Sequence, residues 1–352
     1  MTLELLRVLD DAGRAPVDPA LPAVSLRLAM FRHMLRVRLL EERLAALQRR
    51  GEIGFFGSSL GQEAVPVAAA FAVAPEDWVF PALREGAVML VRGFPLVTYL
   101  AQMVGSARDV QKGRQMPSHQ ASRSVRQVSW SSSIGTQLPH AVGMALAAAR
   151  AGDGALALAF MGEGATSTPD FHAALNLAGV FRARVVFVCQ NNHYALSVPA
   201  CRQTRAASFA LKARAYALAG RRVDGNDALA VYRAVREGAE RARSGLGATL
   251  VECVTYRRGP HSSSDDPSRY RSASEEAGWA ERDPLALLRR HLMLEGALGP
   301  ADETALASAL ETEIGAAVTL ALSDPPPARE TLFADVYARM PWNLAEQSRE
   351  PA

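Results

Sequence analysis

The sequence GALALAFMGEGATSTPDFHAALNLAGVFRARVVFVCQNNHYALS, residues 154–197, contains two short apolar runs with a helical pattern between them. The runs at 155–161 and 185–189 have the length and composition of buried strands. Small polar residues follow each run, with GEG at 162–164 and QNN at 190–192. Because ligands bind at the carboxyl ends of strands in open parallel sheets, we expect the chemistry of this chain at these two strand ends.

The rest of the chain repeats this alternation of strands and helices. It predicts an α/β fold with a doubly wound, mostly parallel sheet flanked by helices, with an N-terminal helical arm and a C-terminal helical segment. We divide the chain into an N-terminal arm and helix at 1–50, an α/β domain at 51–273, and a C-terminal helical region at 274–352 that packs on the same domain. Further strands are expected at 78–80, 221–224 and 249–256, and helices at 25–50, 62–73, 87–103, 140–150, 208–218, 227–243, 274–323 and 330–346.

The composition is that of an ordinary globular protein. The 352 residues are 49% hydrophobic and 21% charged, with a net charge of +3, which leaves enough apolar residues for a large core. A nucleic-acid-binding surface would need clustered basic residues with interleaved aromatics, and the sequence has no such cluster. The cysteines Cys189, Cys201 and Cys253 form no C-x-x-C pair, which argues against a cysteine zinc site.

The sequence favours the cytoplasm over a membrane or an exported location. No apolar run is expected to reach the roughly 18 residues of a membrane span. The N-terminus carries Glu4, Asp10 and Asp11, whereas signal and transit peptides are basic and poor in acidic residues. We therefore expect a cytoplasmic protein that contacts neither membrane nor nucleic acid.

Two well-known motifs occur, each without a feature that its function requires. GSSLG at 57–61 matches the G-x-S-x-G elbow of hydrolases, but that elbow follows a strand, and Gly54 makes 52–56 a poor strand. GEGATS at 162–167 resembles the dinucleotide fingerprint, which requires a third glycine where this chain has Ser167. A serine hydrolase and a Rossmann dehydrogenase are therefore disfavoured.

The two polar strand ends fit a site for a metal ion and a diphosphate better. Glu163 offers a carboxylate between two glycines, and Asn192 offers an amide oxygen after the neighbouring strand. Mg²⁺ prefers such oxygen ligands and is usually shared between protein and phosphate. A helix that begins near Thr168 would point its N-terminal NH groups at the same anion. The alternative is a pair of ordinary turns, because glycine and asparagine are common turn residues.

The same residues resemble a known family. GEG followed by NN looks like the thiamine-diphosphate motif, G-D-G and then N-N, of the α subunit of 2-oxo acid dehydrogenase E1 components. The resemblance covers nearly the whole chain and is greatest to the branched-chain 2-oxo acid dehydrogenase α subunit. The matching segments are GQEA at 61–64, GRQMPSH at 113–119, SIGTQLPHAVGMA at 133–145, RVDGND at 222–227, HSSSDDPSRYRS at 261–272 and LFADVYARMP at 332–341.

The resemblance implies a role for each matching residue at the cofactor. Glu163, Asn192 and the carbonyl of Tyr194 match the Mg²⁺ ligands, and Arg84 matches an arginine that binds the diphosphate. The full cofactor-binding set implied in this way is Arg84, Ser132, Ile134, Gly162, Glu163, Gly164, Ala165, Gln190, Asn192, Tyr194 and His261.

Further roles follow from the same resemblance. His261 matches the histidine implicated in passing the acyl group to lipoamide, and Ser132 is the second residue implied in catalysis. Ser262 matches a serine that is phosphorylated in mitochondrial relatives, and His119 is a second candidate histidine on a basic loop. A potassium site is implied for Ser131, Ser133, Thr136 and Gln137.

The chain also departs from the family pattern. Gln190 stands where the family can have an arginine that contacts the diphosphate. Loss of this positive charge should weaken cofactor binding, because a hydrogen bond to a charged group contributes roughly 1.5–3 kcal/mol. The departures are Glu163 for aspartate, Pro260 for the first of two histidines, Leu83 for tyrosine, Gln190 for arginine and Thr168-Pro169 for Glu-Gly.

The resemblance implies oxidative decarboxylation of a branched-chain 2-oxo acid, of the 3-methyl-2-oxobutanoate type, and acyl transfer to the lipoyl group of an E2 acyltransferase. The family's glutamate that activates the cofactor lies on the E1 β subunit. This chain should therefore supply half of each active site in an α₂β₂ heterotetramer. A pyruvate or acetoin dehydrogenase α subunit and a non-catalytic homologue remain alternatives.

Overall fold

The computed structural model describes residues 3–16, 21–334 and 336–350, so parts of the expected N-terminal arm and of the 332–341 tail segment lie outside the described residues. The centre is a six-stranded sheet of order β1-β7-β8-β4-β3-β2 in which all neighbours are parallel. Its strands are β1 (Leu5–Leu6), β2 (Trp78–Phe80), β3 (Ala157–Gly162), β4 (Val185–Asn191), β7 (Ala219–Asp224) and β8 (Thr249–Val254), and a separate antiparallel hairpin pairs β5 (Tyr194–Ala195) with β6 (Val198–Pro199).

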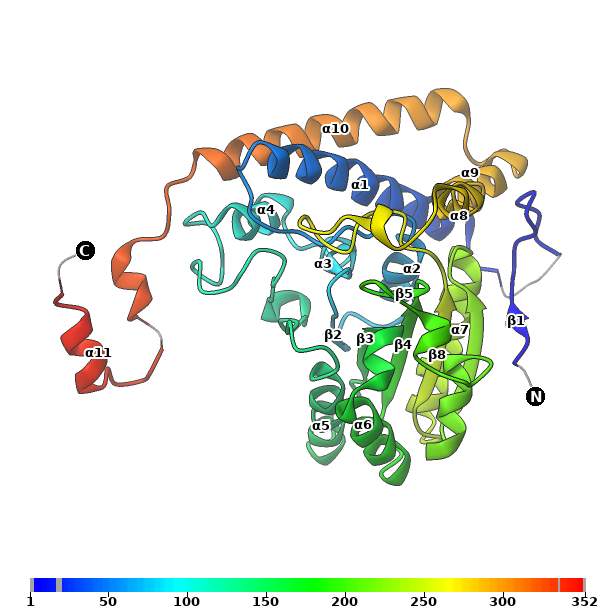
Figure 1. The fold of residues 1–352 in the computed structure, drawn as a ribbon, viewed down its shortest axis with the longest axis horizontal. Helices are drawn as coiled ribbons and strands as arrows, with labels where there is room; N and C mark the ends of the chain where they lie inside the picture. The colour runs from blue at the N-terminus through cyan, green and yellow to red at the C-terminus, as the bar shows by residue number, and fades with distance from the viewer. Residues whose placement is uncertain (1–2, 17–20, 335, 351–352) are drawn as a thin grey trace.

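Both faces of this sheet are covered by helices, which confirms the doubly wound architecture (Figure 1). Alternate side chains of β3 enter different cores: Leu158 and Phe160 pack on one face, and Ala159 and Met161 on the other. The first core contains α1 (Val24–Arg49), α2 (Ala64–Ala72) and α7 (Ala228–Arg243), and the second contains α5 (Gln137–Arg150), α6 (Pro169–Val180) and the 3-10 helix η4 (Phe209–Tyr216).

Prolines divide two regions that the apolar pattern of the sequence predicts to be continuous helices. The region expected at 87–103 is two helices, α3 (Gly86–Val91) and α4 (Leu96–Val104), because Pro95 caps the second. The region at 274–323 is α8 (Ala273–Ala280), α9 (Pro284–Leu294) and α10 (Pro300–Ser323), and a proline starts both α9 and α10.

The N-terminal arm contains a strand that the sequence did not reveal. β1 is two residues long and extends the sheet beside β7. The buried carboxylate of Asp227 accepts hydrogen bonds from the amides of Val8 (2.6 Å) and Leu9 (2.7 Å), and Arg7 pairs with Asp224 at 2.8 Å. The arm is therefore attached to the first residues of α7 by its backbone.

Helix α10 contradicts the expectation that no segment could span a membrane. By length and composition it is the one helix of the described residues that could, with a mean hydropathy of 1.4. Two carboxylates, Glu311 and Glu313, lie near its middle, and Glu313 pairs with Arg36 of α1. The helix packs along α1 and α4 and buries Leu310 and Ile314 against them (Figure 1).

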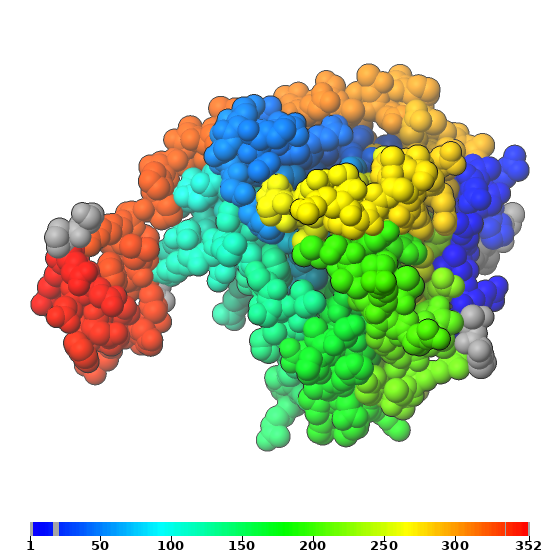
Figure 2. Space-filling model, viewed as in Figure 1, coloured from blue at the N-terminus to red at the C-terminus, as the bar shows by residue number. Residues whose placement is uncertain are grey.

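The C-terminal segment from residue 324 projects from the body of the molecule (Figure 2). It contains η6 (Arg329–Leu332) and α11 (Trp342–Gln347), and Trp342 is 80% exposed. Arg108 pairs with Asp324 at its base, and Arg114 donates to the carbonyls of Thr331 and Ala334. Leu332, Tyr337 and Met340 on the same segment are also exposed, and a group of exposed apolar side chains is typical of an interaction surface.

We predict that Asp227→Ala lowers the free energy of unfolding by about 3 kcal/mol, because its carboxylate serves the arm and also caps α7 through Leu229 and Ala230. Chemical denaturation measures this change. Asp11→Ala is the matched control, since that carboxylate is 86% exposed and should matter little. Equal effects of the two substitutions would contradict the role assigned to Asp227.

Candidate functional site

The carboxyl ends of β3, β4 and β8 open onto one cavity of about 510 Å³, which is partly open to solvent. The three polar loops that follow these strands meet there, as expected from parallel strands. The structure brings together all of the predicted cofactor-binding residues in the walls of this cavity: Arg84, Ser132, Ile134, Gly162, Glu163, Gly164, Ala165, Gln190, Asn192, Tyr194 and His261.

Glu163 and Asn192 lie side by side because β3 and β4 pair in register, with Gly162 opposite Gln190. The backbone amide of Asn192 donates to Oε2 of Glu163 at 3.4 Å, and the side-chain Nε2 of Gln203 donates to Oε1 of Glu163 at 3.4 Å. The carboxylate is only 1% exposed, and burial raises its pKa. A carboxylate held in such surroundings is stabilised by a cation, which would bring the pKa down again.

The Asn192 side chain is oriented by a residue that sequence reasoning did not single out. Nδ2 of Asn192 donates to Oε1 of Gln62 at 2.9 Å, and Oδ1 accepts from the amide of Tyr194 at 3.3 Å. Gln62 is fully buried in the cavity wall, and among the described residues its Nε2 has no partner. The only sequence signal for Gln62 was its place in the GQEA segment.

The carbonyl of Tyr194 is held by Arg257, a second residue that was missed. One guanidinium nitrogen of Arg257 donates to this carbonyl at 3.1 Å, and the other donates to Leu196 O (2.8 Å) and to Tyr270 Oη (2.7 Å). Arg257 is 1% exposed and lines the cavity from the loop that follows β8. A buried guanidinium at a strand end is suited to a bound anion.

These residues fit Mg²⁺ shared with a diphosphate. The oxygen donors are one carboxylate, one side-chain amide and one backbone carbonyl, a hard set with few protein charges. Among the described residues no group of three or more His, Cys, Asp or Glu side chains could hold a metal by itself. A Cβ added at Gly162 would meet no atom within 4 Å, so glycine here leaves the cavity open for a ligand.

The helix dipole expected at this anion is not in place. The residues Glu163–Ser167 form the short 3-10 helix η2, and α6 begins after it with Thr168 as its cap. The cavity wall includes Glu163, Gly164 and Ala165 but not the first turn of α6. The backbone groups near a bound anion therefore belong to η2.

Arg84 connects the loop after β2 to the loop that carries His261. Its guanidinium donates to the carbonyl of Ser58 and to the carbonyl of His261 at 2.8 Å, and lies 3.4 Å from Nδ1 of His261. Burial, with a contribution from Arg257, lowers the pKa of Arg84 to about 10. Arg84 thus remains a buried cation at neutral pH.

The ring of His261 is neutral at physiological pH. Burial, followed by the charges of Arg84 and Arg257, lowers its pKa to about 4. Because Arg84 donates to Nδ1, the ring proton lies on Nε2. His261 therefore offers an N–H donor to a ligand, and its backbone amide is fixed by Asp265 at 2.7 Å. Ser262, the next residue, is buried.

Ser132 lies on an exposed loop with most of the predicted potassium ligands. Ser131 Oγ accepts from the amide of Ser133 at 3.2 Å, and Thr136 Oγ1 donates to the Ser133 carbonyl at 2.9 Å. The side chain of Gln137 instead donates to Phe160 O on β3 at 2.8 Å. Ile134, beside them, is 57% exposed at the mouth of the cavity.

His119 contacts this loop through Ser132. Its Nδ1 lies 3.1 Å from the Pro117 carbonyl, which places the ring proton there and leaves Nε2 to accept from Ser132 Oγ at 3.3 Å. The ring stacks on Trp130 at 4.0 Å. His119 is therefore positioned to orient the Ser132 hydroxyl, and it is buried rather than lining the cavity.

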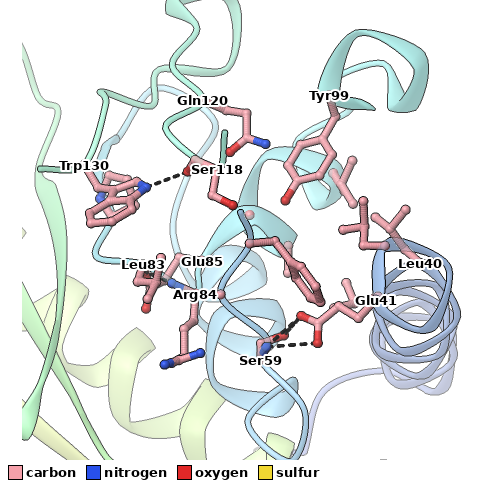
Figure 3. Close-up of a pocket in the computed structure, with 18 of the residues that line it drawn as sticks. Leu40, Glu41, Ser59, Leu83, Arg84, Glu85, Tyr99, Ser118, Gln120 and Trp130 are labelled. Atoms are coloured by element: carbon pink, nitrogen blue, oxygen red, sulfur yellow. Dashed lines mark hydrogen bonds between the residues drawn. The ribbon is translucent and has the colours of Figure 1, made fainter. Parts of the chain in front are cut away.

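A smaller cavity lies behind the wall formed by Leu83, Arg84 and Glu85 (Figure 3). Ser59, the serine of the G-x-S-x-G match, donates from Oγ to Glu41 at 2.5 Å and is 1% exposed. A serine that is buried and hydrogen-bonded to a carboxylate in this way is not a hydrolase nucleophile, as expected from the poor strand before it. Leu83 fills the space beside Gly57, where a Cβ would approach its Cγ to 2.6 Å.

The chain is similar over most of its length to one family of known proteins. The dehydrogenase E1 component family matches residues 31–330. The chain is 40% identical to 2-oxoisovalerate dehydrogenase subunit alpha 2, mitochondrial, of Arabidopsis thaliana, over 97% of this chain and 73% of that protein. It is 39% identical to 2-oxoisovalerate dehydrogenase subunit alpha of Pseudomonas aeruginosa, over 99% of this chain and 87% of that protein. It is 36% identical to the mitochondrial 2-oxoisovalerate dehydrogenase subunit alpha of Homo sapiens, over 99% of this chain and 79% of that protein.

We predict that Arg84→Met raises the pKa of His261 from about 4, because removing a neighbouring cation favours the protonated ring. NMR titration of labelled histidine measures this. The control is Arg269→Met, an exposed arginine on the same loop whose removal should leave the His261 pKa unchanged. An Arg84→Met variant with an unaltered His261 titration would show that burial alone determines the pKa.

Proposed function

The chain belongs to the dehydrogenase E1 component family, and we propose that it is the α subunit of a branched-chain 2-oxo acid dehydrogenase that acts with thiamine diphosphate. It takes part in the oxidative decarboxylation of branched-chain 2-oxo acids. The observation that carries this function is the full-length similarity to proteins named 2-oxoisovalerate dehydrogenase alpha subunits, at 36–40% identity. These names favour the branched-chain function over a pyruvate or acetoin α subunit and over a non-catalytic homologue.

The metal proposed for the cavity is Mg²⁺, held by Glu163, Asn192 and the carbonyl of Tyr194. The support is the buried carboxylate, the amide oriented by Gln62, and the open space at Gly162. When bound, thiamine diphosphate supplies the nucleophilic carbon and the electron sink that decarboxylation requires. The protein residues bind and orient this group, and the burial of the cavity wall restricts water.

The charges in the cavity suit a diphosphate and a 2-oxo acid. Arg84 and Arg257 are buried cations that compensate anionic oxygens, which strengthens each contact in a site of low dielectric constant. His261 presents Nε2–H as a neutral donor, and an anion bound beside Arg84 would raise its pKa and allow it to carry a proton during acyl transfer. Ser132, oriented by His119, is the second side chain proposed near the reacting atoms.

Potassium is proposed at the loop of Ser131, Ser133, Thr136 and Gln137, where it would order an exposed segment at the mouth of the cavity. The partner subunits proposed are an E1 β subunit, in an α₂β₂ heterotetramer, and a lipoylated E2 acyltransferase. The exposed Ile134 and Trp342 support a partner that covers the cavity mouth and the C-terminal arm. The cytoplasm is the proposed location.

The function is tested by purifying the chain with its β subunit and assaying CO₂ release from 2-oxo acids with thiamine diphosphate and Mg²⁺. We predict that the kcat/KM for 3-methyl-2-oxobutanoate exceeds that for pyruvate by at least about tenfold, the discrimination expected from filling an apolar pocket. A preference for pyruvate would replace the branched-chain assignment with the pyruvate alternative. Absence of CO₂ release from every acid would favour a non-catalytic homologue.

The metal site is tested with Glu163→Gln and Glu163→Asp in the same α–β complex. We predict that Glu163→Gln loses the Mg²⁺-dependent binding of thiamine diphosphate, because the amide cannot compensate the metal charge, whereas Glu163→Asp retains it. Isothermal titration calorimetry with and without Mg²⁺ measures both. The proposal fails if Glu163→Gln binds the cofactor with the affinity of the wild type.

A further inference from the structure

Glu85 is a buried carboxyl group in the cavity wall that the proposed mechanism does not use. It is 1% exposed, and its Oε2 accepts from the amides of Ala82 (2.7 Å) and Arg84 (3.1 Å). Its Oε1 accepts from Nε2 of Gln190 on β4. The Arg84 guanidinium is engaged with Ser58 and His261 instead. In the described part of the chain, no salt bridge to Glu85 is formed, so this carboxylate is held by neutral donors.

The hydrogen-bonding capacity of Gln190 depends on the protonation of Glu85. While Nε2 donates to an ionised Glu85, the other end of the amide is Oε1, which is buried and has no partner among the described residues. Oε1 is an acceptor, so it repels the oxygens of an anion. If Oε1 is turned toward Glu85, the two oxygens require a proton between them, and the NH₂ group becomes available to the anion.

We propose that Glu85 and Gln190 form a proton-linked anion receptor, in which Glu85 takes up one proton as the Gln190 amide turns its NH₂ group toward the diphosphate. The proton is added to Oε1 of Glu85 and is donated to Oε1 of Gln190, while Oε2 keeps both of its backbone donors. No other bond changes. This inference rests on the proposed function because it takes the diphosphate as the ligand of the cavity.

The surroundings of Glu85 make this proton uptake accessible near neutral pH. Burial raises its pKa to about 7, against the opposing effect of its backbone donors and of Arg84. Besides Arg84, the titratable groups that share its cavity walls are Glu41 on α1, Tyr99 on α4, Glu163 after β3, Tyr194 on β5, and Arg257 and His261 after β8. Because an arriving anion disfavours a second negative charge, it further favours the protonated form of Glu85.

The direction of the pH dependence follows from this linkage. A ligand that binds only with Glu85 protonated binds with constant affinity below the pKa and loses affinity as pH rises above it. Between pH 7 and pH 9 the affinity should fall roughly 50-fold through this group alone. A permanently charged side chain at position 190 would remove this pH dependence, because it could pair with the ionised Glu85 and contact the anion at the same time.

The test is isothermal titration calorimetry of thiamine diphosphate into the α–β complex at pH 8 with saturating Mg²⁺, repeated in buffers of different ionisation enthalpy. Wild type should take up about 0.9 proton more per cofactor bound than Glu85→Gln, whose amide mimics the protonated acid. Gln190→Arg is the second variant. It should also lose the extra proton uptake, because the arginine can pair with Glu85 while that carboxylate stays ionised. Proton exchanges on the cofactor or on His261 are common to all three proteins and cancel in the comparison.

The outcomes separate this inference from the function on which it rests. Cofactor binding with equal proton uptake in wild type, Glu85→Gln and Gln190→Arg overturns the receptor and leaves the proposed function intact. Absence of thiamine diphosphate binding in wild type overturns the proposed function, and this inference with it. If Glu85→Gln does not fold, loss of proton uptake in Gln190→Arg supports the inference, and retained uptake contradicts it.

Discussion

The parallel pairing of β3 with β4, and of β4 with β8, is the constraint on which the site depends. Parallel strands end at one edge of a sheet, so every loop that follows them is delivered to the same place. The pairing of Gly162 with Gln190 then places Glu163 within reach of Asn192. A shift of one residue in this register would turn every side chain of β4 to the opposite face and separate the two groups. The helices on both faces are packed against alternate side chains of these strands, so the fold and the site share one register.

Desolvation is the second physical factor at this edge. Glu85, Glu163, Arg84 and Arg257 are all buried there, and each must be compensated by hydrogen bonds, by an opposite charge or by a change of protonation. The chain provides this in part: Arg257 is held by carbonyls, and Glu85 by amides. The hydrogen bonds that Asn192 and Gln203 donate to Glu163 are both long, at 3.4 Å, which makes Glu163 the group most in need of a cation. The same desolvation that raises the pKa of the carboxyl groups keeps His261 neutral.

Most of the fold could be predicted from the sequence because its central strands are continuous apolar runs bounded by small polar residues. β1 could not, since two residues carry no periodicity and this strand exists through the contacts of Asp227. The apolar periodicity continues across Pro95, Pro284 and Pro300, so it does not show the helix breaks that these prolines cause.

The candidate site divides in the same way. Glu163 and Asn192 stand out because both follow strands, whereas Gln62, Glu85 and Arg257 are defined by partners distant in sequence. No local pattern reports that Gln190 contacts Glu85 across the cavity wall. The departure at position 190 was visible in the sequence as a lost charge. Its consequence, a Glu85 carboxyl group that forms no salt bridge in the described part of the chain, is visible only in the fold.

The central claim is that this chain supplies the metal and diphosphate half of an active site completed by another subunit. Anomalous diffraction from crystals of the α–β complex, grown with thiamine diphosphate and with Mn²⁺ in place of Mg²⁺, tests it most directly. The account predicts a single anomalous peak within coordination distance of Glu163, Asn192 and the carbonyl of Tyr194, at about 2.0–2.3 Å from each oxygen. A cofactor bound with its metal elsewhere, or with no peak at these three residues, would contradict it.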